Sequence, residues 1–333
     1  MYSVARLSKK DLRILFRNTA MKKGINEAIV EKDFWVCLTL DYLFHSCKWS
    51  DSFTFKGGTS LSKCFNLISR FSEDIDIILD WRTLDYGMNE PWEERSNNQQ
   101  DKFNKTANLR AEAFLREFLL PTLIKDMSDI LGEDALFYID DNDAQTICFE
   151  YPRIFNTPSV LQIIRLEIGA LAAWTPSLEK TISPYVADFY PKIFKKRETK
   201  ILTVAPERTF WEKVTILHHE ANRPETSEMP LRYSRHYYDL YCIAHSDNKE
   251  LAFKNKYLLE KVVDFKMKFY PRKWAKYEEA CIGGLRLVPP TYRLPALKED
   301  YENMKEMMFG EYPKFNELMA YIGDLEKEIN SLG

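Results

Sequence analysis

The pattern of apolar and polar positions predicts a first part with helices and strands and a second part made mainly of helices. Apolar residues recur at helical spacing after the capping residues Ser8 and Asn26, which indicates amphipathic helices at 8–23 and 27–44. Strands are predicted at about 53–56 and 75–79, as a hairpin of 135–139 and 146–151, and, buried, over 160–170. Further helices are predicted at 101–131, 206–220, 234–245, 249–269, 297–309 and 313–332, and loops at 81–100 and 271–295.

Two neighbouring segments combine a glycine turn with paired carboxylates: FKGGTSLSK at 55–63 and RFSEDIDI at 70–77. Residues two apart on a strand share a face, so Asp74 and Asp76 would lie side by side and attract a cation such as Mg²⁺. Gly57 and Gly58 would allow a tight turn, and Thr59 or Ser60 would cap a helix whose free amides hold a triphosphate. Each motif alone is weak, because such turns usually only connect elements and such acids often lie on solvated strand edges. Together they predict a metal-dependent nucleotidyl-transfer site.

Two features near this site have alternative interpretations. Glu167 is the only acid in the predicted strand 160–170. It would be a third carboxylate or a base for the attacking hydroxyl, or else a surface residue paired with Arg165. The polar segment 81–100 is either a disordered insertion or an active-site lid.

Composition limits the possible partners. The chain has 333 residues with 45% hydrophobic content, enough for one large or two medium domains. Its 50 acidic and 47 basic residues give a formal charge of -3, so a nucleic acid would need a local basic patch. One candidate consists of Lys192, Lys195, Lys196, Arg197 and Lys200, although such a run is more often a solvated surface.

The cysteines and the apolar runs indicate the compartment. The six cysteines are scattered without the spacing of a zinc site, so neither disulfides nor zinc is expected. No apolar run is long enough to span a bilayer, and residues 1–6 carry no signal-peptide core. A cytoplasmic protein without a membrane partner is expected.

The helical half carries charges within apolar helices, in PERTFWEKV at 206–214 and RHYYDLY at 235–241. From these residues alone, Asp239 is expected to form a structural ion pair with Lys213 or with Arg235. The adjacent His218 and His219 point about a hundred degrees apart on a helix and cannot chelate one metal together. They are interpreted, with Glu220, as a solvated helix end.

Five segments together resemble the nucleotidyltransferase AbiEii/AbiGii toxin family: EKDFWV at 31–36, 56–63, 70–76, Glu212 with Lys213, and 235–241. The likeness covers about residues 25–245. It implies an α+β protein of the DNA polymerase β-like superfamily. A nucleotidyltransferase-fold domain with a mixed sheet and flanking helices would span 1–200, and a helical C-terminal domain would span 201–333. It further implies the toxin of a bacterial toxin–antitoxin or abortive-infection pair, with a cognate antitoxin protein.

The resemblance also implies roles for individual residues. Ser60, within the group Gly57, Gly58, Thr59, Ser60 and Lys63, would bind the nucleoside triphosphate, and Asp74 and Asp76 would hold two Mg²⁺ ions. Lys213 and Asp239 would complete the site from the helical half, forming a cleft between two lobes. Nucleotides would pass to an acceptor, which in some members is the 3′ end of tRNA. Alternatives are a protein or small-molecule hydroxyl as acceptor, and a non-catalytic binding protein.

Overall fold

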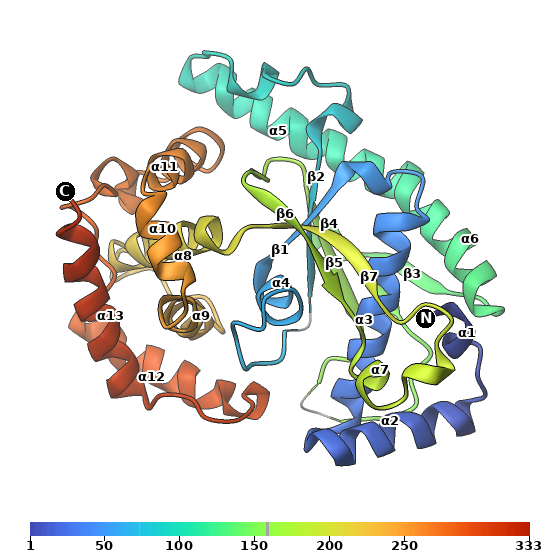
Figure 1. Ribbon diagram of the computed structural model, residues 1–333. Coiled ribbons are helices and arrows are strands. Elements are labelled where there is room, and N and C mark those ends of the chain that lie inside the picture. The colour runs from blue at the N-terminus through green and yellow to red at the C-terminus, as the bar shows by residue number, and fades with distance from the viewer. Residues whose placement is uncertain (73, 158–159) are drawn as a thin grey trace. The chain divides into compact units, whose positions relative to one another are not determined.

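The computed structural model describes residues 1–72, 74–157 and 160–333, so Glu73 of the carboxylate segment lies outside the described residues. The chain forms two compact units (Figure 1). Unit 1 comprises residues 1–64 and 71–203, and unit 2 comprises residues 65–70 and 204–333. Residues 65–70, which lie between the two sequence segments of unit 1, therefore belong to unit 2.

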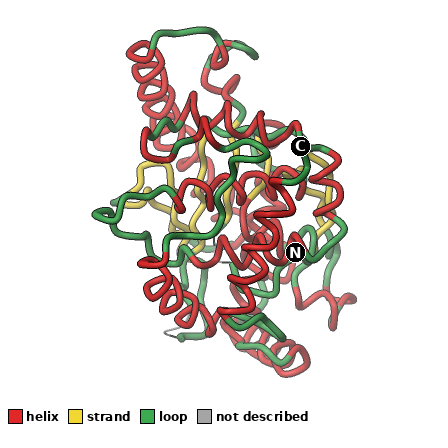
Figure 2. The backbone as a smooth tube through the Cα atoms, turned by 90° about the vertical axis from the view of Figure 1, so that its left-hand side faces the viewer, coloured by secondary structure: helices red, strands yellow, loops and turns green. Residues whose placement is uncertain are grey.

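Unit 1 is built on a seven-stranded mixed sheet in the order β3-β4-β5-β2-β1-β7-β6, which agrees with the predicted α+β class. Figure 2 shows the strands, in yellow, running side by side. The strands are β1 (Phe53–Lys56), β2 (Ile75–Leu79), β3 (Leu136–Asp140), β4 (Asp143–Glu150), β5 (Ile164–Gly169), β6 (Ser177–Ile182) and β7 (Thr199–Val204). The helices are α1 (Tyr2–Ala5), α2 (Lys9–Lys23), α3 (Glu27–His45), α4 (Gly57–Lys63), α5 (Asn97–Phe114), α6 (Leu120–Leu131) and α7 (Tyr185–Phe189).

The first helices form where the capping residues predict them. The Ser8 side chain accepts a hydrogen bond from the Asp11 amide, and the Asn26 side chain accepts one from the Ala28 amide. Gly24 ends α2 in the left-handed conformation, with φ of 70°. Both predicted amphipathic helices are confirmed.

The two faces of the sheet differ. Trp35 of α3 stacks on Tyr151 and meets the edge of Phe149, with ring centroids 6.1 and 6.4 Å away, and so covers one face. Because side chains alternate along a strand, Thr146 and Cys148 of β4 point to the other face. That second face carries the candidate site.

Several expectations in unit 1 were wrong or incomplete. Segment 81–100 is not an irregular insertion, because it forms 3₁₀ turns at Trp81–Leu84 and Glu90–Trp92 and contains the start of α5, with Trp81 buried. The predicted helix 101–131 is two helices joined by a π-helical turn at Leu115–Leu119. Strands β6 and β7 and helix α7 were not predicted.

Unit 2 is helical, with the large side chain of Trp211 fully buried. The predicted helix 249–269 is interrupted at Asn255 and forms two helices. No helix in the described part of the chain is long and apolar enough to cross a membrane. The helices of unit 2 are α8 (Pro206–Ala221), α9 (Ser234–Ala244), α10 (Asn248–Lys254), α11 (Tyr257–Phe269), α12 (Leu294–Asn303) and α13 (Phe315–Asn330).

Candidate active site

A row of polar side chains crosses the face of the sheet opposite Trp35. Asp76 on β2 is the cross-strand partner of Glu167 on parallel β5 and of Lys56 on antiparallel β1. Glu167 is in turn the partner of Thr146 on β4. Cross-strand partners present their side chains on the same face, so this row carries two acids and one base. Asp74 lies just before β2 and brings a third acid within 3.9 Å of Arg165 on β5.

The backbone of Gly57 makes room for one of these acids. Gly57 has φ of +80°, and a β-carbon at this position would lie 1.9 Å from Asp76 Oδ2. Any side chain at position 57 would therefore displace the Asp76 carboxylate. The turn glycine is required by the carboxylate as well as by its own backbone conformation.

Arg165 on β5 lies among the acids of this face. Its Nε is 3.9 Å from Asp74 Oδ1 and 3.7 Å from Glu167 Oε1, and its Nη1 donates a 2.5 Å hydrogen bond to Asp140 Oδ2. Burial would lower the pKa of Arg165, but the Asp140 carboxylate outweighs it and raises that pKa. The Asn142 amide and Arg165 in turn lower the pKa of Asp140. Arg165 therefore stays charged. Arg165 pairs with Glu167, as one of the two alternatives from the sequence expected. Glu167 also lies beside Asp76.

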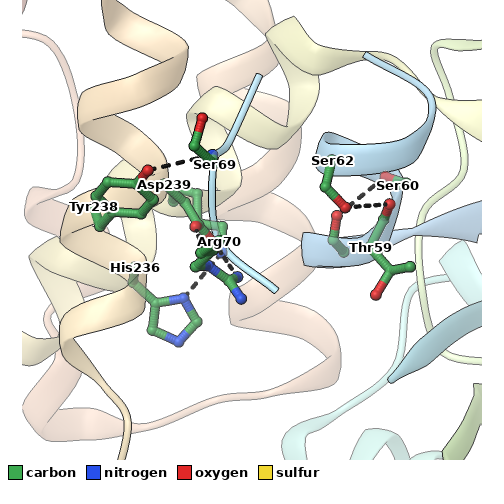
Figure 3. A network of polar contacts seen from close by, with 10 residues as sticks. Thr59, Ser60, Ser62, Ser69, Arg70, His236, Tyr238 and Asp239 are labelled. Carbon is green, nitrogen blue, oxygen red and sulfur yellow. Dashed lines mark hydrogen bonds and ion pairs between the residues drawn. The ribbon is translucent and has the colours of Figure 1, made fainter. Parts of the chain in front are cut away.

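Thr59 and Ser60 do not cap the helix, contrary to expectation. Helix α4 begins at Gly57 after Lys56, with no side-chain cap, so both hydroxyls lie inside its first turns. The buried Thr59 hydroxyl donates to the Asp74 carbonyl at 2.5 Å, and the buried Ser60 hydroxyl donates to the Gly57 carbonyl at 3.1 Å. Figure 3 shows both among their neighbours. The Thr59 bond ties α4 to the residue that begins the carboxylate pair.

Lys63 ends α4 in a buried setting. Its ammonium donates to Asp33 Oδ1 at 2.6 Å and to the Ser183 carbonyl at 2.9 Å, and lies 4.1 Å from the ring centroid of Tyr185. Burial opposes the charge, but Asp33 raises the pKa of Lys63 well above its usual value. These contacts join α4 to α3 and α7.

A second polar cluster lies within unit 2. Arg70 binds both oxygens of Asp239, through Nε at 2.7 Å and Nη2 at 2.9 Å, and Lys213 donates to Asp239 Oδ2 at 2.7 Å. Figure 3 shows the Asp239 carboxylate facing the Arg70 guanidinium. The ion pair of Lys213 with Asp239 is confirmed, whereas the second cation is Arg70 and not Arg235. Arg70 was overlooked as a partner, although it opens the segment 70–76 that carries the family resemblance.

In this cluster Arg70 and Lys213 both bind the Asp239 carboxylate. Burial would raise the pKa of Asp239, yet Arg70 and Lys213 hold it well below its usual range. The pKa of Lys213 is lowered, first by burial and further by Arg70, against the effect of Asp239. Burial and Lys213 lower the pKa of His236, whose neutral ring faces the Lys213 ammonium with Nδ1 at 3.1 Å. One carboxylate thus faces two cations.

Two other interpretations change with the structure. His218 and Glu220 are fully buried, so 218–220 is not a solvated helix end. His218 accepts the Arg286 amide at Nδ1, 3.1 Å away, which is a structural role. In the basic segment 192–200, acids compensate three of the five cations, through the pairs Lys196 with Asp41, Arg197 with Glu198, and Lys200 with Glu179.

The chemistry of the donors on the sheet face fits a hard divalent cation. Asp76 on β2 and Asp74 just before this strand supply carboxylate oxygens, and the Asp74 side chain is a quarter exposed. Among the described residues, no group of three or more His, Cys, Asp and Glu side chains is placed to hold a metal ion. Two carboxylates with further ligands from water and phosphate match the way proteins usually bind Mg²⁺.

Comparison with known proteins shows similarity to a protein family and to solved structures. The model of one protein family, described as nucleotidyl transferase AbiEii toxin of type IV toxin–antitoxin systems, matches residues 41–321. Among solved structures, the chain is similar to MenT4, a nucleotidyltransferase toxin from Mycobacterium tuberculosis H37Rv, at 16% identity and a TM-score of 0.47. That alignment covers 98% of this chain and 94% of the other. No curated protein matches the sequence.

Proposed function

Because the chain belongs to the family of nucleotidyl transferase AbiEii toxins of type IV toxin–antitoxin systems, we propose that it uses Asp74 and Asp76 to transfer nucleotides to the 3′ end of a tRNA. The family makes the chain a nucleotidyltransferase with a nucleoside triphosphate as substrate. The observation that carries the residue assignment is the close approach of the Gly57 backbone to the Asp76 carboxylate, with Asp74 just before the same strand.

The proposed reaction is an in-line displacement. A terminal hydroxyl of the acceptor attacks the α-phosphorus, the new oxygen–phosphorus bond forms, and the bond to the departing pyrophosphate breaks. Asp74 and Asp76 would hold the divalent metal, which when bound activates the hydroxyl and neutralises charge on the leaving group. Glu167, the cross-strand neighbour of Asp76, would accept the proton of the hydroxyl.

Lys213 is proposed to offset the negative charge of the triphosphate. Its ammonium is positioned by Asp239, whose two oxygens are also bound by Arg70. An ammonium held in a fixed place in this way suits a polyanionic ligand. In this proposal Asp239, fully buried, acts through Lys213 and Arg70 and touches no substrate.

A basic segment in unit 2 supports a nucleic acid as the acceptor. Residues 266–276 carry five Lys and Arg and no acid. Arg272 and Lys273 are exposed, Tyr270 is 49% exposed, and the Arg272 guanidinium lies 5.9 Å from the ring centroid of Trp274. Exposed cations beside aromatic rings suit a nucleic-acid strand, whose phosphates and bases they can contact. Lys276 pairs with Glu279. We prefer this segment to 192–200 because Arg272 and Lys273 are exposed beside aromatic side chains, whereas acids pair with three cations of 192–200.

Incubation of the purified protein with Mg²⁺, each labelled triphosphate in turn and total tRNA tests the proposal. Label should appear in tRNA, and Asp74→Asn or Asp76→Asn should lower its incorporation at least about a thousandfold, since the charge stabilisation is lost. Asp80→Asn, which changes an acid just beyond the same strand, is the matched control and should keep full activity. Label in protein alone would replace tRNA by a protein hydroxyl, and growth arrest that survives Asp74→Asn would favour a non-catalytic binding role.

The contribution of the basic segment is measured separately, by fluorescence anisotropy of labelled tRNA. The double variant Arg272→Ala with Lys273→Ala should weaken tRNA binding about tenfold and reduce its salt dependence. The matched variant Lys192→Ala with Lys195→Ala, in the other basic segment, should bind as the wild type does. If the Lys192 and Lys195 double variant instead weakened tRNA binding more, segment 192–200 would be the tRNA-binding surface.

A further inference from the structure

Arg165 occupies a distinctive place on the sheet face. It precedes Glu167 by two positions on β5, so both side chains project to the face that carries Asp74 and Asp76. Its Nε lies 3.9 Å from Asp74 Oδ1 and 3.7 Å from Glu167 Oε1. The guanidinium therefore neutralises part of the negative charge of the acids proposed to act on the metal and the acceptor hydroxyl.

The far end of the same guanidinium is held elsewhere. Nη1 donates to Asp140 Oδ2 at 2.5 Å, and Asp140 also accepts the Asn142 amide at 2.8 Å. Asp140 is at the end of β3, so the turn of the β3–β4 hairpin restrains Arg165. The bond to Asp140 is short, whereas the distances to Asp74 and Glu167 exceed hydrogen-bonding range. Arg165 is thus anchored to Asp140 and paired only electrostatically with the other two acids.

We infer that Arg165 is an internal counter-ion of the carboxylate site, competing with the divalent cation for Asp74, and that Asp140 limits this competition by restraining the guanidinium. This inference rests on the proposed role of Asp74 and Asp76. A fixed positive charge about 4 Å from a metal-binding carboxylate lowers its affinity for a dication. The protein alone would then bind the metal weakly, and the metal would enter mainly with the triphosphate, whose own charges offset Arg165. Arg165 is a positioning residue in this scheme.

Binding of Mn²⁺ to the full-length protein without nucleotide, followed by electron paramagnetic resonance, tests the inference independently of catalysis. Arg165→Gln removes the charge but keeps a donor for Asp140, and should tighten Mn²⁺ binding about tenfold. Arg165→Lys keeps the charge and should bind Mn²⁺ within a factor of about two of the wild type. Asp140→Asn releases the guanidinium toward Asp74 and should weaken Mn²⁺ binding severalfold. Mn²⁺ binding is therefore expected to become tighter in the first variant, stay nearly unchanged in the second and become weaker in the third.

Arg82→Met is the matched control, because Arg82 pairs with Asp80 just after the same strand and its loss should leave Mn²⁺ affinity unchanged. Thermal unfolding establishes that each variant is folded. If Arg165→Gln does not fold, the inference is tested by comparing the Mn²⁺ affinity of Arg165→Lys with that of Asp140→Asn. Unchanged or weaker Mn²⁺ binding in folded Arg165→Gln overturns the inference. If Asp74→Asn abolishes Mn²⁺ binding in that case, the proposed carboxylate site stands. Mn²⁺ binding that survives Asp74→Asn overturns both.

Discussion

The backbone of Gly57 and the carboxylate of Asp76 are so close that a β-carbon at position 57 would lie 1.9 Å from Asp76 Oδ2 and 3.0 Å from Asp76 Cβ. The added β-carbon would be too close to the Asp76 β-carbon as well as to its carboxylate oxygen, so rotation of the carboxylate alone cannot relieve the clash. Glycine at position 57 is therefore linked to the geometry of the proposed catalytic acid.

Gly57→Ala should abolish most transferase activity in a protein that still folds. The β-carbon forces Asp76 out of its row with Glu167, and the left-handed backbone adds about 1–2 kcal/mol of strain. We expect at least a hundredfold fall in kcat, measured by label transfer, together with this modest loss in the free energy of unfolding.

Gly132→Ala separates the two effects. Gly132 ends α6 with φ of +78°, and a β-carbon there would meet no atom within 4 Å. It should lose stability by the same backbone strain and keep full activity. Equal activity in the two variants would mean that Asp76 tolerates displacement.

Removal of Asp239 should destabilise the protein more than removal of Lys213. Asp239→Asn leaves Arg70 and Lys213 buried without their counter-ion, which costs about 3–5 kcal/mol. Lys213→Met leaves Asp239 still bound by Arg70 and should cost less, about 1–2 kcal/mol. It should however raise KM for the triphosphate. Urea unfolding and steady-state kinetics measure the two effects, and an unchanged KM in Lys213→Met would place Lys213 outside the nucleotide site.

The pH dependence of this cluster has a definite sign. The pKa of Asp239 in the folded protein lies below its value of about 3.9 in the unfolded chain. Its stabilisation is thus fully present above about pH 4 and is lost only as the pH falls below that value. Asp239→Asn should flatten this acid limb in urea unfolding between about pH 4 and pH 2.

Local patterns were sufficient to predict the strands that carry the candidate acids. β1 and β2 have the predicted limits, because Gly57 and the acids bound short apolar runs and leave little choice of where each strand begins and ends. The sequence left Glu167 with two alternatives, and the pairing of β2 with β5 places it beside Asp76. β6 escaped prediction because it is a largely exposed strand at the end of the sheet, and such strands carry no hydrophobic alternation.

Long-range pairs could not be predicted in the same way. Arg70 and Asp239 are 169 residues apart in the chain, so neither has a local pattern that identifies its partner. Glu31, Lys32 and Asp33 are consecutive charges in the middle of α3, where all three are buried. Sequence periodicity assigns charges to solvated faces, and only the tertiary fold shows what they bind.

Lys63→Met should reduce stability without changing nucleotide affinity. It leaves Asp33 buried without its cation, which costs about 3–5 kcal/mol. Lys56→Met is the matched change at the other end of α4, because Lys56 lies in the row with Asp76. It should lower activity with little loss of stability. A raised KM for the triphosphate in folded Lys63→Met would instead support the nucleotide-binding role implied by the family.

Glu31 should make the protein less stable as the pH rises from about 5 to 7. Its fully buried carboxyl accepts the amides of Ile154 and Phe155 at 2.7 and 3.1 Å, and burial raises its pKa to about 7. The folded protein therefore holds a proton that the unfolded chain has released, and roughly 2 kcal/mol of stability is lost across this range. Glu31→Gln should remove this slope in urea unfolding at pH 5 and 7.5, whereas Glu27→Gln, in the first turn of the same helix, should retain it. A slope that persists in Glu31→Gln would assign the pH dependence to another group.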